Sequence, residues 1–248
     1  AYSMFHGPFM FVNQNGQRFF NEANWVQAKS LQMLNQPGAV AYSIFDSNFG
    51  ADTADSLQYG GGMFWDTMSR TVEQEFDPQQ IIDLVEGEAA AGKDVLGNET
   101  SVTAWKCDTL EELADAIGVD KDNFLKQVEE YNAMCNGAQA GYDWQFTKPA
   151  KFLKPLLKGP YYVARHFPSG YGSLGGIQVN ENMQVLDTEL CPMPGFYACG
   201  TDTATVFADS YCFYHPGSTM SYAINSGRIA GMEAVAYMDS DEFIDPED

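Results

Sequence analysis

A short stretch near the end of the chain combines groups that could do acid–base chemistry with a helix start that could bind an anion. From Phe213 to Gly231 it reads FYHPGSTMSYAINSGRIAG. Tyr214 and His215 carry side chains that donate and accept protons. The Pro-Gly-Ser-Thr after them predicts a helix N-terminus, whose free N–H groups and partial positive charge favour an electron-rich ligand close to the backbone. The alternative is a surface helix for which Ser and Thr serve only as caps.

The residues before this stretch predict the elements that position it. SLGGIQVNENMQVLD predicts a hairpin with its turn near Asn180 to Asn182, GFYACG predicts a short buried strand, and the closing residues predict a helix. The segment Gly170 to Gly175 matches the spacing G-x-G-x-x-G. That dinucleotide fingerprint needs a helix directly after it, and because a hairpin is predicted instead we reject the match.

The first part of the chain predicts a mixed set of strands and helices. Two helices have clear start signals, with Asp108 or Thr109 capping the first and Asp120 capping the second. Residues 47–63 are rich in glycine and predict a mobile loop, and residues 148–167 predict an extended linker between two units. The remaining stretches predict a hairpin over FMFVNQNGQRFFNE, a helix over WVQAKSLQMLNQPG and a buried strand over AVAYSIFD.

Composition excludes several classes of partner. Thirty-four Asp and Glu against thirteen Lys and Arg give a formal charge of -21, and such a field repels nucleic acids and anionic lipids. No run of apolar residues reaches the length of a membrane-spanning helix, and the first residues show no signal peptide. The five cysteines form no C-x-x-C pair and no zinc-like spacing with histidine, which disfavours a zinc or iron–sulfur protein and favours inert buried thiols.

Five motifs in order resemble the flavoproteins of the fumarate reductase and succinate dehydrogenase superfamily. Its members carry a T-x-G-G hairpin, V-L-D, the strand P-I-P-G-L-Y-A-A-G and a helix ending F-G-R-x-A-G. This chain has SLGGIQVNENMQVLDTELCPMPGFYACG followed by GSTMSYAINSGRIAG, and its VNQNGQRFFNE and FLKQVEEYNAMCNGAQAGYDWQF resemble a hairpin and a helix of the capping domain. The resemblance covers essentially the whole chain.

The resemblance implies a fold and a cofactor. We expect an α+β capping domain over residues 1–158, and over residues 159–248 a hairpin, strand and closing helix from a FAD-binding domain whose Rossmann half is absent. FAD is the implied cofactor of the complete protein, with little binding expected to this part alone. The positions that match the family's flavin contacts are Gly200, Thr201, Asp202, Gly217, Ser218, Thr219 and Met220.

The family's catalytic positions differ in this chain. The proton-donating arginine expected about eight residues after the RF pair at Arg18 is Val26, the histidine before the T-x-G-G is Tyr171, and the arginine before the closing helix is Tyr214. A dicarboxylate needs cationic clamps, so fumarate and succinate are disfavoured as substrates.

An aromatic cleft with polar tips remains, built from Tyr171, Tyr214 and His215, with Tyr211 and Tyr222 as further candidates. It resembles ketosteroid dehydrogenases, which have a tyrosine near a Pro-Gly at this helix start. This predicts reduction or dehydrogenation of a carbon–carbon bond activated by a carbonyl, since a tyrosine can donate to the carbonyl oxygen. The alternatives are tyrosines that serve only local packing, and a binding module that has lost the chemistry.

The expected partners are a small-molecule substrate, the N-terminal FAD-binding half and an electron-donor protein, without nucleic acid or membrane insertion. The compartment stays open, because a targeting signal would lie in that other half. For Arg165 and His166 a structural role in ion pairing is predicted, with a role in the site as the alternative.

Overall fold

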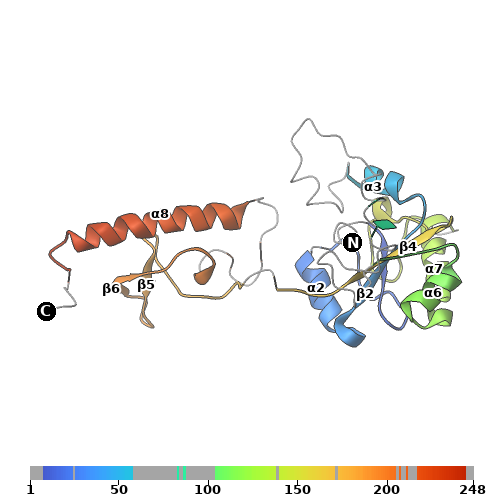
Figure 1. The fold of residues 1–248 in the computed structure, drawn as a ribbon, viewed down its shortest axis with the longest axis horizontal. Helices are drawn as coiled ribbons and strands as arrows, with labels where there is room; N and C mark the ends of the chain where they lie inside the picture. The colour runs from blue at the N-terminus through green and yellow to red at the C-terminus, as the bar shows by residue number, and fades with distance from the viewer. Residues whose placement is uncertain are drawn as a thin grey trace. The chain divides into compact units, whose positions relative to one another are not determined.

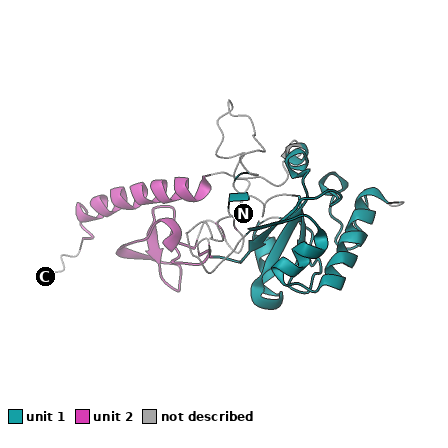
Figure 2. Ribbon diagram, turned by 45° about the vertical axis from the view of Figure 1, so that its right-hand side comes forward, with its two compact units in different colours: residues 1–169 teal, residues 170–248 magenta. Residues whose placement is uncertain are grey.

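The structure is a computed structural model, and it describes residues 8–24, 26–57, 83, 86–87, 104–137, 140–170, 173–204, 207, 211 and 217–243. The chain divides into two compact units, residues 1–169 (unit 1) and 170–248 (unit 2; Figure 2). The sequence predicts a boundary at 158/159 instead. Residues 161–166 fall in unit 1 because they form a central strand of its sheet.

Unit 1 is built on a four-stranded antiparallel sheet (Figure 1). Its order is β1 (Met10–Val12), β2 (Ala41–Phe45), β4 (Tyr161–His166) and β3 (Ala104–Cys107). Every residue of β2 is buried, as expected for a strand with neighbours on both sides and helices over both faces. The register pairs Ser43 of β2 with Ala164 of β4, and His166 follows on the same face of the sheet.

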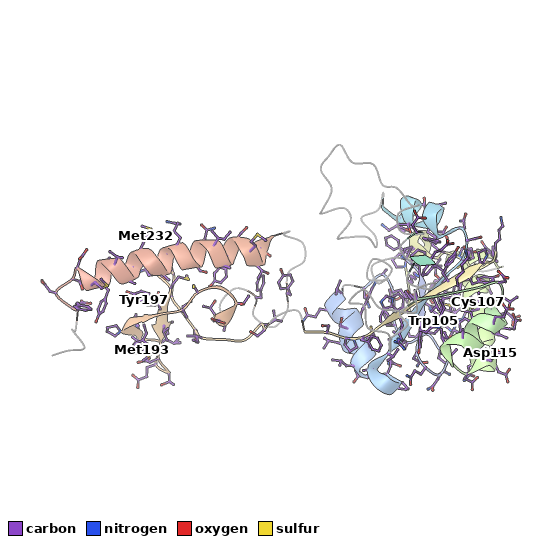
Figure 3. All side chains as sticks on the ribbon, viewed as in Figure 1. Trp105, Cys107, Asp115, Met193, Tyr197 and Met232 are labelled. Atoms are coloured by element: carbon purple, nitrogen blue, oxygen red, sulfur yellow. The ribbon has the colours of Figure 1, made fainter. Side chains whose placement is uncertain are left out.

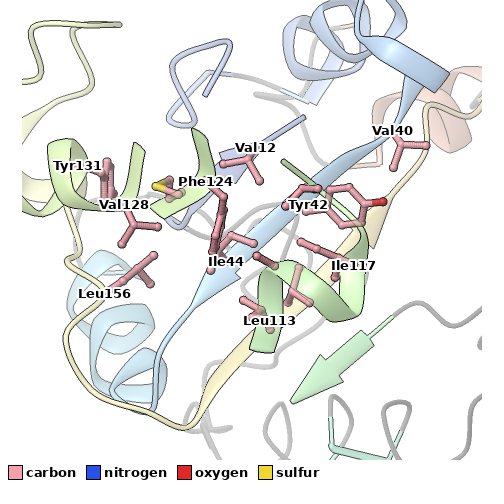
Figure 4. Close-up of a cluster of buried hydrophobic side chains, with 14 of the residues drawn as sticks. Val12, Val40, Tyr42, Ile44, Leu113, Ile117, Phe124, Val128, Tyr131 and Leu156 are labelled. Atoms are coloured by element: carbon pink, nitrogen blue, oxygen red, sulfur yellow. The ribbon is translucent and has the colours of Figure 1, made fainter. Parts of the chain in front are cut away.

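Helices cover both faces of this sheet. α6 (Leu110–Ile117) and α7 (Lys121–Asn136) pack on one face, where Leu113, Phe124 and Val128 meet Tyr42 and Ile44 in the main core cluster (Figure 4). On the other face, α2 (Val26–Leu34) places Met33 against Phe11 and Ala41, and Phe49 of α3 (Phe49–Leu57) packs edge-on against Phe45. Two single 3-10 turns, η1 (Pro37–Ala39) and η2 (Ala150–Phe152), complete the unit.

Local start signals predicted α6 and α7 correctly. Thr109 forms a complete capping box with Glu112, and the Asp120 side chain accepts from the N–H of Asn123 at 2.9 Å. Gly118 ends α6 in the left-handed conformation, with φ 68°. These signals act within a few residues, so the sequence alone determines them.

Three predictions for unit 1 are wrong. The turn at Asn15-Gly16 exists, but the returning strand over Arg18 to Phe20 does not, because β1 pairs with β2 and the Arg18 side chain enters a buried ionic network. Residues 49–57 of the predicted loop form α3, while residues 58–63 lie outside the described residues. The predicted linker contains β4, a strand with partners on both sides.

Unit 2 consists of a small hairpin and a long helix. β5 (Gln184–Leu186) pairs with β6 (Pro192–Tyr197), the 3-10 turn η3 (Gly200–Asp202) follows, and α8 (Ser218–Met238) closes the unit. The predicted turn is present, with the Met183 N–H donating to the Asn180 carbonyl at 3.1 Å. β6 forms at the predicted strand but is largely exposed, so its predicted burial is wrong. The mixed α and β class predicted for the chain is confirmed.

Within the described part of the chain, no helix has both the length and the hydropathy that crossing a bilayer would require.

Candidate functional site

The start of α8 leaves backbone donors available. Gly217 precedes the helix in the left-handed conformation, with φ 75°, and no atom lies within 4 Å of the position a Cβ would take. The first bond within the helix runs from the Ser221 N–H to the Gly217 carbonyl at 2.8 Å. The N–H groups of Ser218, Thr219 and Met220 therefore precede the helical hydrogen-bond ladder. The first turn carries no acidic residue that would compete with an anionic ligand.

The two hydroxyls of this first turn differ. The Ser218 hydroxyl is buried and makes no hydrogen bond, whereas the Thr219 hydroxyl bonds the hydroxyl of Tyr211. A buried hydroxyl without a partner loses its hydration at a cost, unless a ligand atom occupies the partner position. Ser218, the open position at Gly217 and the free N–H groups therefore fit the polar edge of a cofactor such as a flavin.

η3 brings the second predicted cofactor group against the same helix. The Gly200 N–H donates to Ser226 Oγ at 2.9 Å, and Ser226 Oγ donates in turn to the Tyr222 carbonyl at 2.6 Å. Gly200 has φ 63°, and a Cβ on it would lie 3.7 Å from the Cβ of Ala223. The predicted cofactor residues 200–202 and 217–220 thus lie on two elements that pack against each other.

The segment Gly175-Gly176 runs beside η3. The Ile177 N–H donates to the Asp202 carbonyl at 2.8 Å, and a Cβ on Gly176 would lie only 2.3 Å from that carbonyl oxygen. Only glycine tolerates so close a backbone approach. The side chains of Thr201 and Asp202 stay exposed. The tight backbone contact explains the second glycine, Gly176, of the T-x-G-G-like motif in structural terms.

The predicted catalytic residues Tyr171, Tyr214 and His215 lie outside the described residues, so their roles stay predictions. Of the two further candidates, the Tyr222 hydroxyl pairs with Thr203 Oγ1 at 2.8 Å, and the Tyr211 hydroxyl pairs with Thr219. Both hydroxyls have partners inside unit 2.

Val26 is the first residue of α2, at the position where the resemblance would place a proton-donating arginine. Its half-buried side chain packs against a cluster that contains Phe11, Phe20 and Met33. Valine offers neither a charge nor a proton, so this helix start presents an apolar surface.

Unit 1 contains a buried ionic network that the sequence did not predict. Arg18 binds Glu22 through Nε and Nη2, both at 2.8 Å, and its Nη2 also lies 2.8 Å from Asp143 Oδ2. All three side chains are fully shielded from solvent. Arg18 and Glu22, four residues apart, give a weak sequence signal, but nothing in the sequence pairs either of them with Asp143.

Two buried lysines extend this network. Lys148 Nζ lies 3.4 Å from Glu22 Oε2 and donates to the Tyr131 hydroxyl at 2.9 Å. Lys29 of α2 lies over the Phe11 ring, with Nζ 5.7 Å from the centroid. Burial, together with the positive charge of Lys148, lowers the pKa of Lys29 to about 7, although the negative charge of Glu22 acts in the opposite direction. Burial alone would raise the pKa of Glu22, but the Lys148 and Arg18 cations hold it below its usual range.

Arg165 and His166, for which a structural ion-pair role is predicted, are neighbours on β4. Successive strand residues point to opposite faces, so the two side chains separate. The Arg165 guanidinium lies over the rings of Trp105 and Phe167, 5.5 and 4.9 Å from the centroids. The His166 ring stacks on Phe11, and its Nε2 lies 2.8 Å from Ser43 Oγ.

Comparison with known proteins places this geometry in a family. The model of the family described as FAD binding domain matches residues 6–212. The vinyl phenol reductase of Lactiplantibacillus plantarum is 30% identical over 234 residues, which are 93% of this chain and 43% of that protein.

Two solved structures are also similar. A flavocytochrome c3 fumarate reductase in its open conformation matches with a TM-score of 0.60 at 23% identity, over 95% of this chain and 34% of that one. The 3-ketosteroid Δ1-dehydrogenase of Sterolibacterium denitrificans, in complex with 1,4-androstadiene-3,17-dione, matches with a TM-score of 0.61 at 27% identity, over 94% of this chain and 40% of that one. The chain thus spans less than half the length of the proteins it matches.

The resemblance to the fumarate reductase flavoproteins is therefore confirmed, and this chain belongs to the family of FAD-dependent oxidoreductases defined by that FAD-binding domain.

Proposed function

We propose that this chain is the capping and C-terminal part of a flavin-dependent oxidoreductase that reduces or dehydrogenates a carbon–carbon bond activated by a carbonyl. The observation that carries the proposal is the start of α8, where three N–H groups precede the helical hydrogen-bond ladder, the Ser218 hydroxyl is buried without a partner, and the Cβ position of Gly217 is open. The relatives named as reductases and dehydrogenases support this class of reaction.

Residues of unit 2 would hold the flavin. Ser218, Thr219 and Met220 present N–H groups, and the positive end of α8 stabilises negative charge on the bound ring. Gly200 keeps the backbone of η3 free of a side chain at its turn. Bound FAD supplies hydride transfer to or from one carbon of the substrate bond, while the protein moves a proton at the neighbouring carbon.

The substrate is expected to be larger and less charged than fumarate. Val26 replaces a cation with an apolar side chain at the start of α2, and a dicarboxylate would lose a clamp there. Tyr214 is assigned to donate a hydrogen bond to the substrate oxygen, with Tyr171 and His215 beside it as polar groups of the cleft. The named substrates of two relatives, a vinyl phenol and a 3-ketosteroid, carry an oxygen function and no dicarboxylate.

The experiment uses the complete protein expressed from its gene. We expect it to purify with flavin, visible as an absorbance at about 450 nm. We also expect it to convert an enone or a ketosteroid but not fumarate. Tyr214→Phe is expected to keep the flavin and lose most of the turnover, since the phenol donates to the substrate and not to the cofactor. Tyr142→Phe, at an exposed position of unit 1, serves as the matched control.

The outcomes separate the candidates. A complete protein that stays colourless in the presence of added FAD would indicate a binding module that has lost the chemistry, and would end the enzyme proposal. If the complete protein binds flavin and turns over fumarate, the proposed substrate class is wrong. Unchanged turnover of Tyr214→Phe would remove Tyr214 from the mechanism.

The chain of 248 residues alone is expected to bind FAD weakly and to be inactive. Fluorescence titration with FAD tests this directly.

A further inference from the structure

Arg165 lies at one end of the sheet of unit 1, beside side chains from two neighbouring strands. The register places Tyr42 of β2 directly opposite Arg165 of β4, and it places Trp105 of β3 opposite Val163, two residues before Arg165. Residues that are paired across strands, or two apart along one strand, share a face of the sheet. Tyr42, Trp105 and Arg165 therefore lie on one face, which is the face that α6 and α7 cover.

The Arg165 guanidinium lies over two aromatic rings. Its Cζ is 5.5 Å from the centroid of Trp105 and 4.9 Å from the centroid of Phe167. Trp105 stands on β3 two residues before Cys107, and both pack against the main core cluster (Figure 3). Phe167 is 53% exposed, so the group formed by Tyr42, Trp105, Arg165 and Phe167, here called the Arg165 cluster, reaches the protein surface.

The polar atoms of this cluster have no acceptor or donor among the described residues. The Arg165 side chain makes no ion pair and no hydrogen bond with them, and its Nε is buried. The Tyr42 hydroxyl also makes no hydrogen bond with them, and Figure 4 shows it pointing away from Ile44 and Phe124. A buried N–H without an acceptor costs free energy, so an acceptor that reaches this guanidinium would bind favourably.

Tyr42 and Arg165 are close enough to act on one ligand together. Burial raises the pKa of Tyr42, and the positive charge of Arg165 acts in the opposite direction. The rings of Tyr42 and Trp105 pack edge to face, with their centroids 6.5 Å apart. A guanidinium and a phenol hydroxyl held side by side are both hydrogen-bond donors to an oxyanion.

Arg18 shows which group completes an arginine in this setting. Its guanidinium also lies over two aromatic rings, with Cζ 4.9 Å from the centroid of Tyr131 and 5.1 Å from that of Phe146. Two carboxylates of its network each lie 2.8 Å from Nη2. Arg165 has the same stacking but lacks the carboxylates among the described residues. A carboxylate is therefore the missing partner whose geometry matches the guanidinium fork.

The rest of the ligand follows from charge and exposure. The chain carries a formal charge of -21, which repels polyanions such as nucleotides more strongly than a ligand with one negative charge. The exposed ring of Phe167 offers an apolar surface beside the guanidinium, and aromatic rings pack well on such a surface.

We infer that the Arg165 cluster is a binding site for a small aromatic acid with a single carboxylate. The carboxylate accepts hydrogen bonds from the Arg165 guanidinium and the Tyr42 hydroxyl, and the aromatic ring packs against Phe167. The inference goes beyond the proposed function, because binding there requires neither flavin nor turnover.

A series of three probes tests the ligand class on the complete protein as purified. Benzoate carries both the ring and the charge, benzamide keeps the ring without the charge, and acetate keeps the charge without the ring. Ligand-observed NMR at neutral pH measures the three affinities. We expect benzoate to bind about tenfold more tightly than either analogue, because it alone combines the charge-assisted hydrogen bonds with ring packing. An affinity for benzoate no higher than for benzamide or acetate would overturn the inference.

Variants place the bound benzoate. Arg165→Gln is expected to weaken binding by about tenfold or more, because it removes the charged donor. Tyr42→Phe removes only a hydroxyl and should weaken binding several-fold. Lys126→Gln makes the same change in net charge as Arg165→Gln at a side chain that is 74% exposed, and it should leave the affinity unchanged.

The outcomes decide between this cluster and another place on the protein. Unchanged affinity in Arg165→Gln would put benzoate elsewhere, for example in the substrate cleft, and would overturn the inference. Tryptophan fluorescence during urea unfolding checks that each variant is folded. If Arg165→Gln does not fold, Tyr42→Phe still decides the question, because it keeps the ring that packs on Trp105 and an unchanged affinity would contradict the inference.

Discussion

The two units of the chain bury their sequences in different ways. Unit 1 covers both faces of its sheet with helices and places charged side chains in its interior, including the fully shielded Arg18, Glu22 and Asp143. Unit 2 has a long helix on a two-stranded hairpin and leaves one side of that helix apolar and exposed. The difference teaches that unit 1 buries a large mixed core of apolar and charged side chains, whereas the described residues of unit 2 bury few and leave much of α8 exposed.

This comparison matters for the proposed chemistry. The apolar start of α2 at Val26 packs against the cluster of Phe11, Phe20 and Met33 in unit 1. The start of α8, the proposed flavin contact, belongs to unit 2, whose described residues bury few apolar side chains. Cofactor binding is therefore expected to stabilise unit 2.

The largest effect is expected from Arg18→Met. This change leaves the buried Asp143 carboxylate without its cation and Glu22 with Lys148 alone, and breaking such a buried pair costs about 3–5 kcal/mol. All four tryptophans of the sequence fall in residues 1–169, so tryptophan fluorescence during urea unfolding reports on unit 1. Arg228→Met, at an exposed position of α8, is the control and should leave this transition unchanged. A loss below about 1 kcal/mol would show that the network contributes no more than a surface ion pair.

Ser226→Ala tests the hydrogen bond that joins η3 to α8 in unit 2. It leaves the Gly200 N–H without its acceptor, which is expected to cost about 1–3 kcal/mol. Hydrogen exchange of peptides from α8 and η3 should become faster, while the tryptophan transition of unit 1 stays in place. Ser221→Ala, at an exposed position, is the matched control. A shift of the unit 1 transition would show that the two units do not unfold independently.

Lys29→Met tests whether burial in unit 1 lowers the pKa of Lys29. The unfolded chain holds the Lys29 proton up to a pKa near 10.5, whereas the folded protein releases it near 7. Between these values the unfolded state binds more protons, so stability rises with pH, by at most about 1.4 kcal/mol per pH unit.

Urea unfolding between about pH 7 and pH 8.5, inside that window, measures this slope. Lys29→Met should be more stable than the parent at pH 7. Its free energy of unfolding should also rise much less with pH than that of the parent. The thiol of Cys135, whose pKa burial raises to about 12, has the opposite influence only at higher pH. Equal slopes in the two proteins would mean that Lys29 keeps its charge in the folded state.

The smallest effect is expected from Thr109→Ala at the start of α6. Removing the capping box costs about 1 kcal/mol of unit 1 stability, because the Glu112 N–H loses its side-chain acceptor. Thr109→Ser keeps a hydroxyl and should retain most of the stability. Circular dichroism during thermal unfolding compares the two, and equal melting temperatures would show that the cap is dispensable.

Local signals in the sequence determined much of this protein. The caps at Thr109 and Asp120, the turns near Asn15-Gly16 and Asn180, and the start of α8 at Gly217 all depend on residues a few positions apart. The motif order also identified the family. The glycines of such motifs stand where the backbone leaves no room for a side chain, as Gly176 does beside Asp202.

Only the tertiary structure decided which distant residues meet. The pairing of β1 with β2, the place of β4 between β2 and β3, and the contact of Arg18 with Asp143 each join segments far apart in the chain. Strand pairing and buried ion pairs depend on which surfaces the whole chain can cover. Residues adjacent in the sequence do not determine this. For the same reason the sequence predicted the helix of α8, but the tertiary structure was needed to show which of its sides remains exposed.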